Sequence, residues 1–118
     1  MEYSFEKLRV WQEAKVLLVM LYRITNGFPK SELYGFTSQL RRAGLSVPSN
    51  IAEGSSRTGK KDQSRFYTIA YSSLIEILNQ VIIAEELGFI SSEELLELRK
   101  NIEHISNMLN ALRKSTSI

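Results

Sequence analysis

Apolar residues recur every three or four positions through most of this chain, and no other feature constrains its fold as strongly. The clearest series lies near the C-terminal end and consists of Leu95, Leu98, Ile102, Ile105, Leu109 and Leu112. An α-helix completes a turn in about 3.6 residues, so this spacing places all of these side chains on one face. Ser91 and Glu94, just before the series, have the spacing of a capping box, which begins a helix. We therefore predict a helix over residues 91–114.

Three further series of the same kind precede this one. They predict helices over residues 6–26, 34–54 and 60–87. The positions expected to face a core are Val10, Ala14, Leu17, Leu21 and Ile24, then Phe36, Leu40, Ala43, Val47 and Ile51, then Phe66, Ala70, Ser73, Ile77, Val81 and Ala84. Gly27 and Gly88 follow the first and third helices, where a left-handed glycine can close a helix. Pro48 falls inside the second helix and removes a backbone hydrogen bond, so we expect a kink there.

The predicted connections between these helices are short, which favours antiparallel neighbours. The sequence therefore predicts an all-α fold, an antiparallel up-down four-helix bundle that forms one domain over residues 1–118. The chain contains no cysteine, which excludes disulfides, thiolate zinc sites and cysteine nucleophiles. The longest apolar run covers residues 16–22, whereas a membrane-spanning helix needs about 20 apolar residues. We expect no membrane segment and a cytoplasmic location.

Two of the predicted helices carry more apolar residues than a single bundle needs. Those off the main series are Val16, Val19 and Met20 in the first helix, and Tyr67, Tyr71, Ile75, Leu78 and Ile82 in the third. Contiguous apolar surface rarely faces water, so this surplus favours association of several copies of the chain. The alternative is a wide core with a few scattered exposed hydrophobic residues, which are common in monomers.

Polar residues follow one another along the second helix at spacings of three and four. They are Gln39, Arg42, Ser46, Asn50, Glu53 and Arg57. These positions border the apolar face, so the side chains are partly shielded from water and need polar partners. One interpretation is a polar network or subunit interface that fixes helix register, formed by Gln39, Ser46, Asn50 and Glu53. The other interpretation is a surface that binds a ligand or a nucleic acid.

Positive charge is concentrated in the middle of the chain. Residues 30–65 contain seven lysines and arginines against three acidic residues, a net charge of +4, whereas residues 66–118 have a net charge of −3. The candidate phosphate-binding residues in this region are Arg41, Arg42, Arg57, Lys60, Lys61 and Arg65. Repeated around an oligomer, these charges would attract a polyanion such as RNA. The alternative is an ordinary solvated charged face.

Motifs for catalysis are weak in this sequence. Residues 54–60 match G-x-x-x-x-G-K, but Lys61 stands where a nucleotide-binding loop needs serine or threonine, and the segment joins two predicted helices. Arg57, Lys60 and Lys61 near a helix start suit a phosphate group without hydrolysis. His104 is the only histidine and lies on the polar side of its helix. We expect no enzyme activity, no catalytic residue, no cofactor and no metal site.

Three segments of the sequence resemble a known family. They are residues 5–12 (FEKLRVWQ), residues 39–43 (QLRRA) and residues 46–54 (SVPSNIAEG), followed by Arg57. Together they resemble the bacterial four-helix-bundle proteins encoded in intervening sequences of 23S ribosomal RNA genes, and the resemblance covers nearly the whole chain. Gly44 and Leu45 depart from that pattern, as do Tyr71 and Ser72, where Arg-Gly is common in the family.

The resemblance implies a four-helix bundle that assembles as a pentameric ring without enzyme activity. The chain is also similar to the accessory variability protein of diversity-generating retroelements, a basic pentamer that associates with reverse transcriptase and nucleic acid. By this likeness Arg41, Arg42 and Arg57 are candidates for nucleic-acid contact. We expect a non-enzymatic homo-oligomer that binds RNA or an RNA-associated protein. The alternative is a protein-interaction scaffold without a role in nucleic-acid binding.

Overall fold

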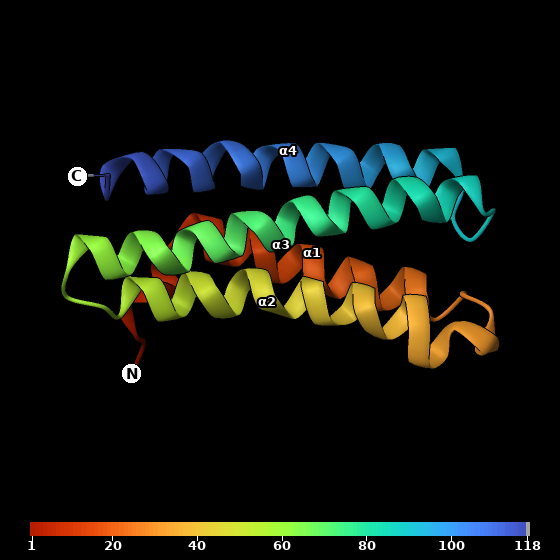
Figure 1. Cartoon of the computed structure of the whole chain (residues 1–118), viewed down its shortest axis with the longest axis horizontal. Coiled ribbons are helices and arrows are strands. Elements are labelled where there is room, and N and C mark those ends of the chain that lie inside the picture. Colours follow the sequence, from red (N-terminus) through yellow and green to blue (C-terminus); the bar gives the residue numbers. More distant parts are fainter. Residues whose placement is uncertain (118) are drawn as a thin grey trace.

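The protein is an antiparallel bundle of four long helices, seen here in a computed structural model that describes residues 1–117 (Figure 1). The helices are α1 (Arg9–Thr25), α2 (Ser38–Ser55), α3 (Lys60–Glu86) and α4 (Ser92–Ser115). Three short turns complete the described chain, η1 (Ser4–Lys7) before α1, and η2 (Lys30–Glu32) and η3 (Leu33–Thr37) between α1 and α2. The bundle measures 43 × 25 × 23 Å. This architecture confirms the predicted fold class.

Two of the three helix-end signals in the sequence, the capping box at Ser91 and the glycine stop at Gly88, are confirmed, and the third, at Gly27, is not. The Ser91 hydroxyl accepts a hydrogen bond from the Glu94 amide at 3.1 Å, and the Glu94 carboxylate accepts one from the Ser91 amide at 2.8 Å. Gly88 closes α3 with a φ of 78°. The left-handed stop predicted at Gly27 is wrong, because Gly88 is the only residue with positive φ within residues 1–117. Instead, the amides of Gly27 and Phe28 bond carbonyls three residues back, at 3.1 Å each, in an ordinary turn.

The second helix differs from its prediction in two ways. Regular helix begins at Ser38 rather than at Tyr34, because η3 is a wider turn in which Gly35 has a non-helical backbone (φ −119°, ψ −106°). The kink expected at Pro48 is not confirmed: α2 runs through this residue, and Pro48 is buried. The irregularity of this segment therefore lies at its start, where it shapes the connection from α1.

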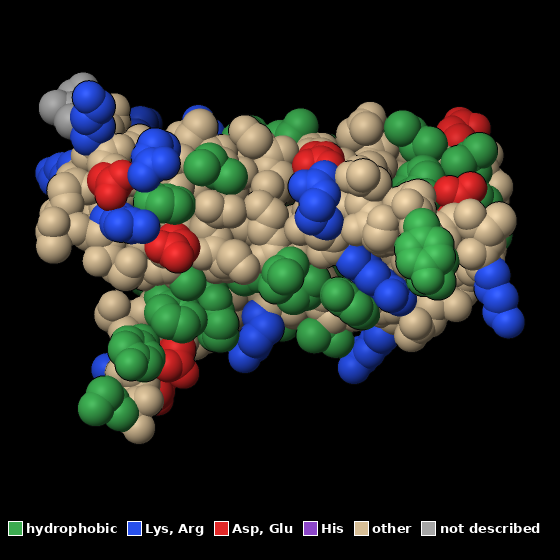
Figure 2. Space-filling view, turned by 60° about the horizontal axis from the view of Figure 1, so that its bottom comes forward, with side chains coloured by type: hydrophobic (Ala, Val, Ile, Leu, Met, Phe, Trp, Pro, Cys, Tyr) green, Lys and Arg blue, Asp and Glu red, His purple; other side chains and the backbone are tan. Residues whose placement is uncertain are grey.

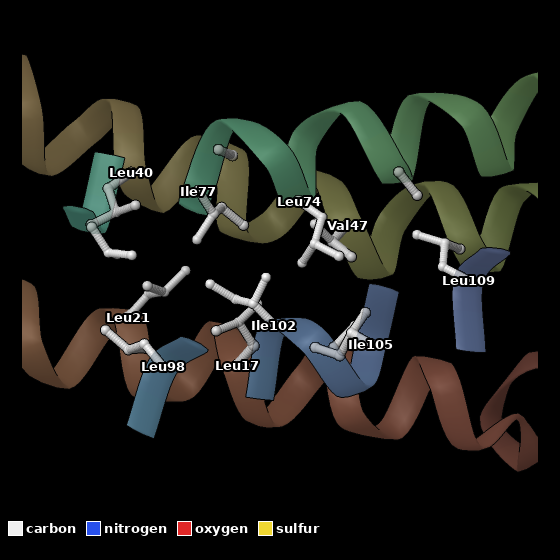
Figure 3. Packing of buried hydrophobic residues seen from close by; sticks show 14 of the residues in the cluster. Leu17, Leu21, Leu40, Val47, Leu74, Ile77, Leu98, Ile102, Ile105 and Leu109 are labelled. Carbon is white, nitrogen blue, oxygen red and sulfur yellow. The ribbon is translucent and has the colours of Figure 1, made fainter. Parts of the chain in front are cut away.

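All four helices contribute to one hydrophobic core (Figure 3). Its fully buried large side chains include Leu17 and Leu21 from α1, Leu40 and Val47 from α2, Leu74 and Ile77 from α3, and Leu98, Ile105 and Leu109 from α4. The predicted core positions are buried except Ile24, Phe36, Phe66, Leu95 and Leu112, which are half-buried at the helix ends. A continuous core of this kind is what holds short-looped helices in register.

Helices α2 and α3 pack most closely, and this contact buries a residue that we expected on the surface. Tyr67 is only 3% exposed, so its assignment to the surplus apolar face was wrong. Its ring lies against Gly54, where an added Cβ would be 2.6 Å from the Tyr67 Cε1 atom. Burial raises the pKa of the Tyr67 hydroxyl above its ordinary value. The absence of a side chain at Gly54 therefore creates the space that this tyrosine fills.

The rest of the predicted apolar surplus lies partly in water. Tyr71, Leu78, Ile82 and Met20 are half-buried. Exposed aliphatic side chains on α1 and α3 are Val16, Val19, Ile69, Ile75 and Ile83. By length and composition α3 could also cross a membrane, which the sequence prediction did not foresee, although a helix packed in a protein core meets the same criterion. Apolar surface beyond the needs of one bundle therefore remains on two helices.

A candidate nucleic-acid interface

The six predicted phosphate-binding residues lie in two groups at opposite ends of α2. We call Arg41 and Arg42 the turn cluster, because they follow η3, and we call Arg57, Lys60, Lys61 and Arg65 the loop cluster, because they surround the α2–α3 connection. Arg41 and Ser55, the last residue of α2, are separated by about 21 Å along the helix at 1.5 Å per residue, and Arg57 follows just beyond. Figure 2 shows lysine and arginine side chains spread along this face, with acidic side chains beside several of them. The positive charge therefore forms a band and not one compact patch.

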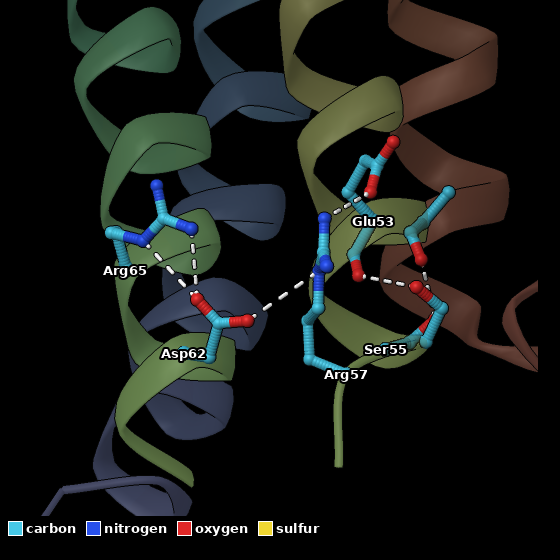
Figure 4. Close-up of polar contacts among 7 residues, drawn as sticks. Glu53, Ser55, Arg57, Asp62 and Arg65 are labelled. Atoms are coloured by element: carbon cyan, nitrogen blue, oxygen red, sulfur yellow. Dashed lines mark hydrogen bonds and ion pairs between the residues drawn. The ribbon is translucent and has the colours of Figure 1, made fainter. Parts of the chain in front are cut away.

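Two arginines of the loop cluster share one carboxylate (Figure 4). Asp62 lies 2.8 Å from the Arg65 guanidinium and 3.6 Å from the Arg57 guanidinium, which also contacts Glu53 at 3.1 Å. Both guanidinium groups lie over the ring of Phe66, with carbon-to-centroid distances of 4.8 and 4.6 Å. Exposed ion pairs of this kind contribute up to about 1 kcal/mol each. They also offset the charge that these arginines would present to a phosphate.

The two lysines of the loop cluster are different. Lys60 and Lys61 occupy the first turn of α3, their side chains are exposed, and neither forms an ion pair with another residue in the described part of the chain. A shallow depression of about 680 Å³ lies beside Lys61, and its other lining residues include Asp62, Arg65 and Ile69. These two ammonium groups are therefore the loop-cluster charges that an incoming anion meets without an intramolecular competitor.

In the turn cluster, Arg42 is held by an acid from another helix. Its guanidinium donates to the Glu76 carboxylate on α3 at 2.8 Å and to the Gln39 side-chain oxygen at 2.8 Å. The side chain of Arg42 is nevertheless 60% exposed. This ion pair connects α2 to α3 at the surface and partly neutralises Arg42.

Arg41 is fixed by neutral groups only. Its Nε donates to the Thr25 hydroxyl at 2.8 Å and its terminal nitrogen to the Asn26 side-chain oxygen at 3.1 Å. The guanidinium lies 4.5 Å from the centre of the Tyr22 ring. No carboxylate is among these partners, so they orient the Arg41 guanidinium without offsetting its positive charge.

The polar stripe of α2 divides into separate contacts. The Asn50 amide donates to the Ser46 carbonyl and hydroxyl oxygens at 2.8 and 3.0 Å, and the Ser73 hydroxyl of α3 lies 2.8 Å from the Ser46 hydroxyl. Gln39 and Glu53 instead bond the arginines of the turn and loop clusters. Ser46 thus connects α2 with α3 and is held by Asn50 of its own helix, whereas the outer members of the stripe orient basic side chains.

Three residues that shape these clusters have no signal in the sequence. Glu76 neutralises Arg42, and the rings of Tyr22 and Phe66 lie beneath Arg41 and Arg57. In each case the two residues belong to different segments of the chain, whereas helical spacing identifies partners only within one helix. Among residues 1–117, no three His, Asp or Glu side chains are grouped so that they could hold a metal ion.

Comparison with known proteins found a matching family model and a solved structure with a similar fold. The family model described as 23S rRNA-intervening sequence protein matches residues 6–111. A crystal structure of a protein of unknown function, from the S23 ribosomal protein family of Bacteroides thetaiotaomicron, is similar with a TM-score of 0.82. The two chains are 17% identical, and the similarity covers 89% of this chain and 98% of the other. No curated protein matches the sequence.

Proposed function

The chain belongs to the family of 23S rRNA-intervening sequence proteins, and on that premise we propose that it is a non-enzymatic homo-oligomer that binds RNA through the turn and loop clusters. The observation that carries this proposal is that three of the six candidate phosphate-binding residues, Arg41, Lys60 and Lys61, have no carboxylate partner within residues 1–117. Cations of this kind can replace the counterions of a phosphate backbone, which is the main source of affinity in RNA binding. The location that we propose is the cytoplasm.

Self-association is the second part of the proposal. The exposed aliphatic side chains of α1 and α3, among them Val19, Ile75 and Ile83, support an interface between copies of the chain. We propose a pentameric ring. Each copy presents the same band of charge, so contacts that are weak in one subunit add in the ring when one RNA spans several subunits.

The double variant Lys60→Ala/Lys61→Ala is expected to bind RNA more weakly and with less salt dependence than the wild-type protein. Each lost phosphate contact lowers the slope of log affinity against log salt by about one. The slope should therefore fall by about two, measured by fluorescence anisotropy with a structured RNA between about 50 and 200 mM salt.

The matched control is Arg99→Ala/Lys100→Ala, which removes the same charge from exposed positions on α4. This control should retain the wild-type slope to within a few tenths. RNA binding that is absent at low salt would contradict the proposal, and so would an unchanged slope in the Lys60→Ala/Lys61→Ala variant.

A scaffold that binds another protein is the second candidate, because the exposed aliphatic side chains also suit a protein partner. A pulldown from a native extract with and without nuclease separates the two functions. Recovery of one protein partner that survives nuclease treatment favours the scaffold, and nuclease-sensitive recovery favours RNA binding.

A further inference from the structure

A groove lies between α1, η3 and the beginning of α2, and both aromatic and basic side chains line it. Its volume is about 510 Å³, and its walls include Tyr22, Leu33, Tyr34, Arg41, Arg42 and Leu45. We call it the aromatic groove. Pockets that bind small molecules or single chemical groups have volumes of about 300–1,000 Å³. The groove is therefore large enough for a flat group such as a nucleobase.

Of the two aromatic side chains of this groove, Tyr34 is open to an incoming ligand, whereas Arg41 covers one face of the Tyr22 ring. Tyr34 is 93% exposed and Tyr22 is 44% exposed. Within residues 1–117, Tyr34 has no side-chain hydrogen bond and no aromatic partner. An exposed tyrosine ring presents a flat face on which another aromatic group can stack.

Tyr34 is exposed on a turn that is firmly held and not on a loose loop. Phe36, two residues along, packs edge-on against Phe28 at 5.8 Å and Phe89 at 5.9 Å between ring centres. The Phe36 amide also donates to the Glu32 carboxylate at 3.3 Å. These contacts fix η3 to the end of the bundle, so the position of the Tyr34 backbone is set before any ligand arrives. Preorganisation of this kind reduces the entropy lost on binding.

The charge around the aromatic groove suits a polyanion. Residues 22–45 contain four basic residues, Arg23, Lys30, Arg41 and Arg42, and one acidic residue, Glu32. Glu76 of α3 offsets Arg42, but Arg41 is held over Tyr22 by neutral groups. An exposed ring beside basic side chains, one of them without a carboxylate partner, is a combination by which proteins bind unpaired nucleotides, with bases on the rings and phosphates near the cations.

We propose that the aromatic groove binds an unpaired segment of RNA, with a base stacked on Tyr34 and the neighbouring phosphates beside Arg41 and Arg42. This inference rests on the proposed RNA-binding function and divides it between two places. The loop cluster, with its lysines and arginines, contacts the phosphate backbone of paired or unpaired RNA alike. The aromatic groove selects RNA whose bases are free, because bases inside a duplex cannot stack on a protein side chain.

The test compares one single-stranded RNA that carries 2-aminopurine with a blunt RNA duplex of the same length, using the full chain at low salt. Tyr34→Ala should weaken single-strand binding roughly 5- to 150-fold, the effect of losing one base–aromatic stack. It should also remove the quenching of 2-aminopurine fluorescence that stacking produces. Duplex affinity and its salt slope should stay at the wild-type values, and Tyr34→Phe should behave as the wild type because it keeps the ring.

Tyr3→Ala is the matched control, since Tyr3 is another exposed tyrosine, 67% exposed, outside the groove. It should leave all RNA affinities unchanged. Single-strand affinity that is unchanged in Tyr34→Ala, while the duplex still binds, overturns the groove assignment and leaves the proposed function standing. Binding of neither RNA by the wild type overturns both. A change in the oligomeric mass of Tyr34→Ala, read by light scattering, would assign the groove to contact between copies and also overturn this inference.

Discussion

The substitution Leu74→Ala is expected to lower the free energy of unfolding by about 2–5 kcal/mol, the usual cost of removing a large aliphatic side chain from a closed core. Leu74 lies on α3, is 0% exposed, and faces the core near Val47 of α2 (Figure 3). The loss combines the transfer energy of the removed methyl groups with the cavity that the fixed helices cannot fill. Urea denaturation monitored by circular dichroism measures it.

Leu87→Ala is the matched control for this prediction, because the same residue type is 56% exposed just after α3. A surface substitution of this kind usually changes stability by less than about 0.5 kcal/mol. If Leu74→Ala and Leu87→Ala destabilised the protein equally, the core described here would be wrong.

The substitution Gly54→Ala is expected to destabilise the protein by about 1–3 kcal/mol, the usual cost of overpacking. In a solvent-exposed helix the same change stabilises by about 1 kcal/mol, so the sign of the effect reports the packing. The new Cβ would lie 2.6 and 2.9 Å from two atoms of the Tyr67 ring and 3.1 Å from the Cβ of Phe66. A rigid, buried ring cannot move aside as a flexible side chain can, so α2 and α3 must separate.

Gly27→Ala provides the comparison for Gly54→Ala. Gly27 does not have a left-handed backbone, and the nearest atom to its added Cβ is the Ile24 carbonyl oxygen at 3.5 Å. Thermal unfolding should show Gly27→Ala unchanged or slightly more stable, since alanine restricts the unfolded chain. A Gly54→Ala variant as stable as the wild type would contradict the close approach of α2 and α3.

Features of the fold that depend on residues close in sequence could be predicted from the sequence. The periodic apolar residues of α4, its capping box and the stop at Gly88 all act within one or two turns of helix. The left-handed stop predicted at Gly27 was wrong although it too is a local feature, and two further features depend on packing against another helix. Tyr67 is buried because a glycine on α2 leaves room for it. At Pro48 periodicity could not show whether the helix bends, since the surrounding packing determines how the lost hydrogen bond is accommodated.

The candidate site could be predicted in its residue types but not in its grouping. The sequence predicted Arg41, Arg42 and Arg57 as basic residues of one charged region, yet the length of α2 separates Arg41 and Arg42 near its start from Arg57 just beyond its end. Glu76, which neutralises Arg42, comes from α3 and lies 34 positions away in sequence. Tyr34 could not be identified, because its exposure depends on how η3 is anchored by three phenylalanines. Each of these contacts joins different segments of the chain, whereas the periodicity of a sequence relates only residues within one helix.

Size-exclusion chromatography with light scattering, run on the purified chain mixed with a structured RNA at low salt, measures the mass of the protein and its RNA binding in one elution peak. If this protein is an RNA-binding oligomer, the protein mass in the peak is a multiple of 13.5 kDa. The ratio of absorbance at 260 to 280 nm should also be raised there, and it should fall when salt releases the RNA. A peak of 13.5 kDa, with the RNA eluting separately at low salt, would contradict both halves of the proposal.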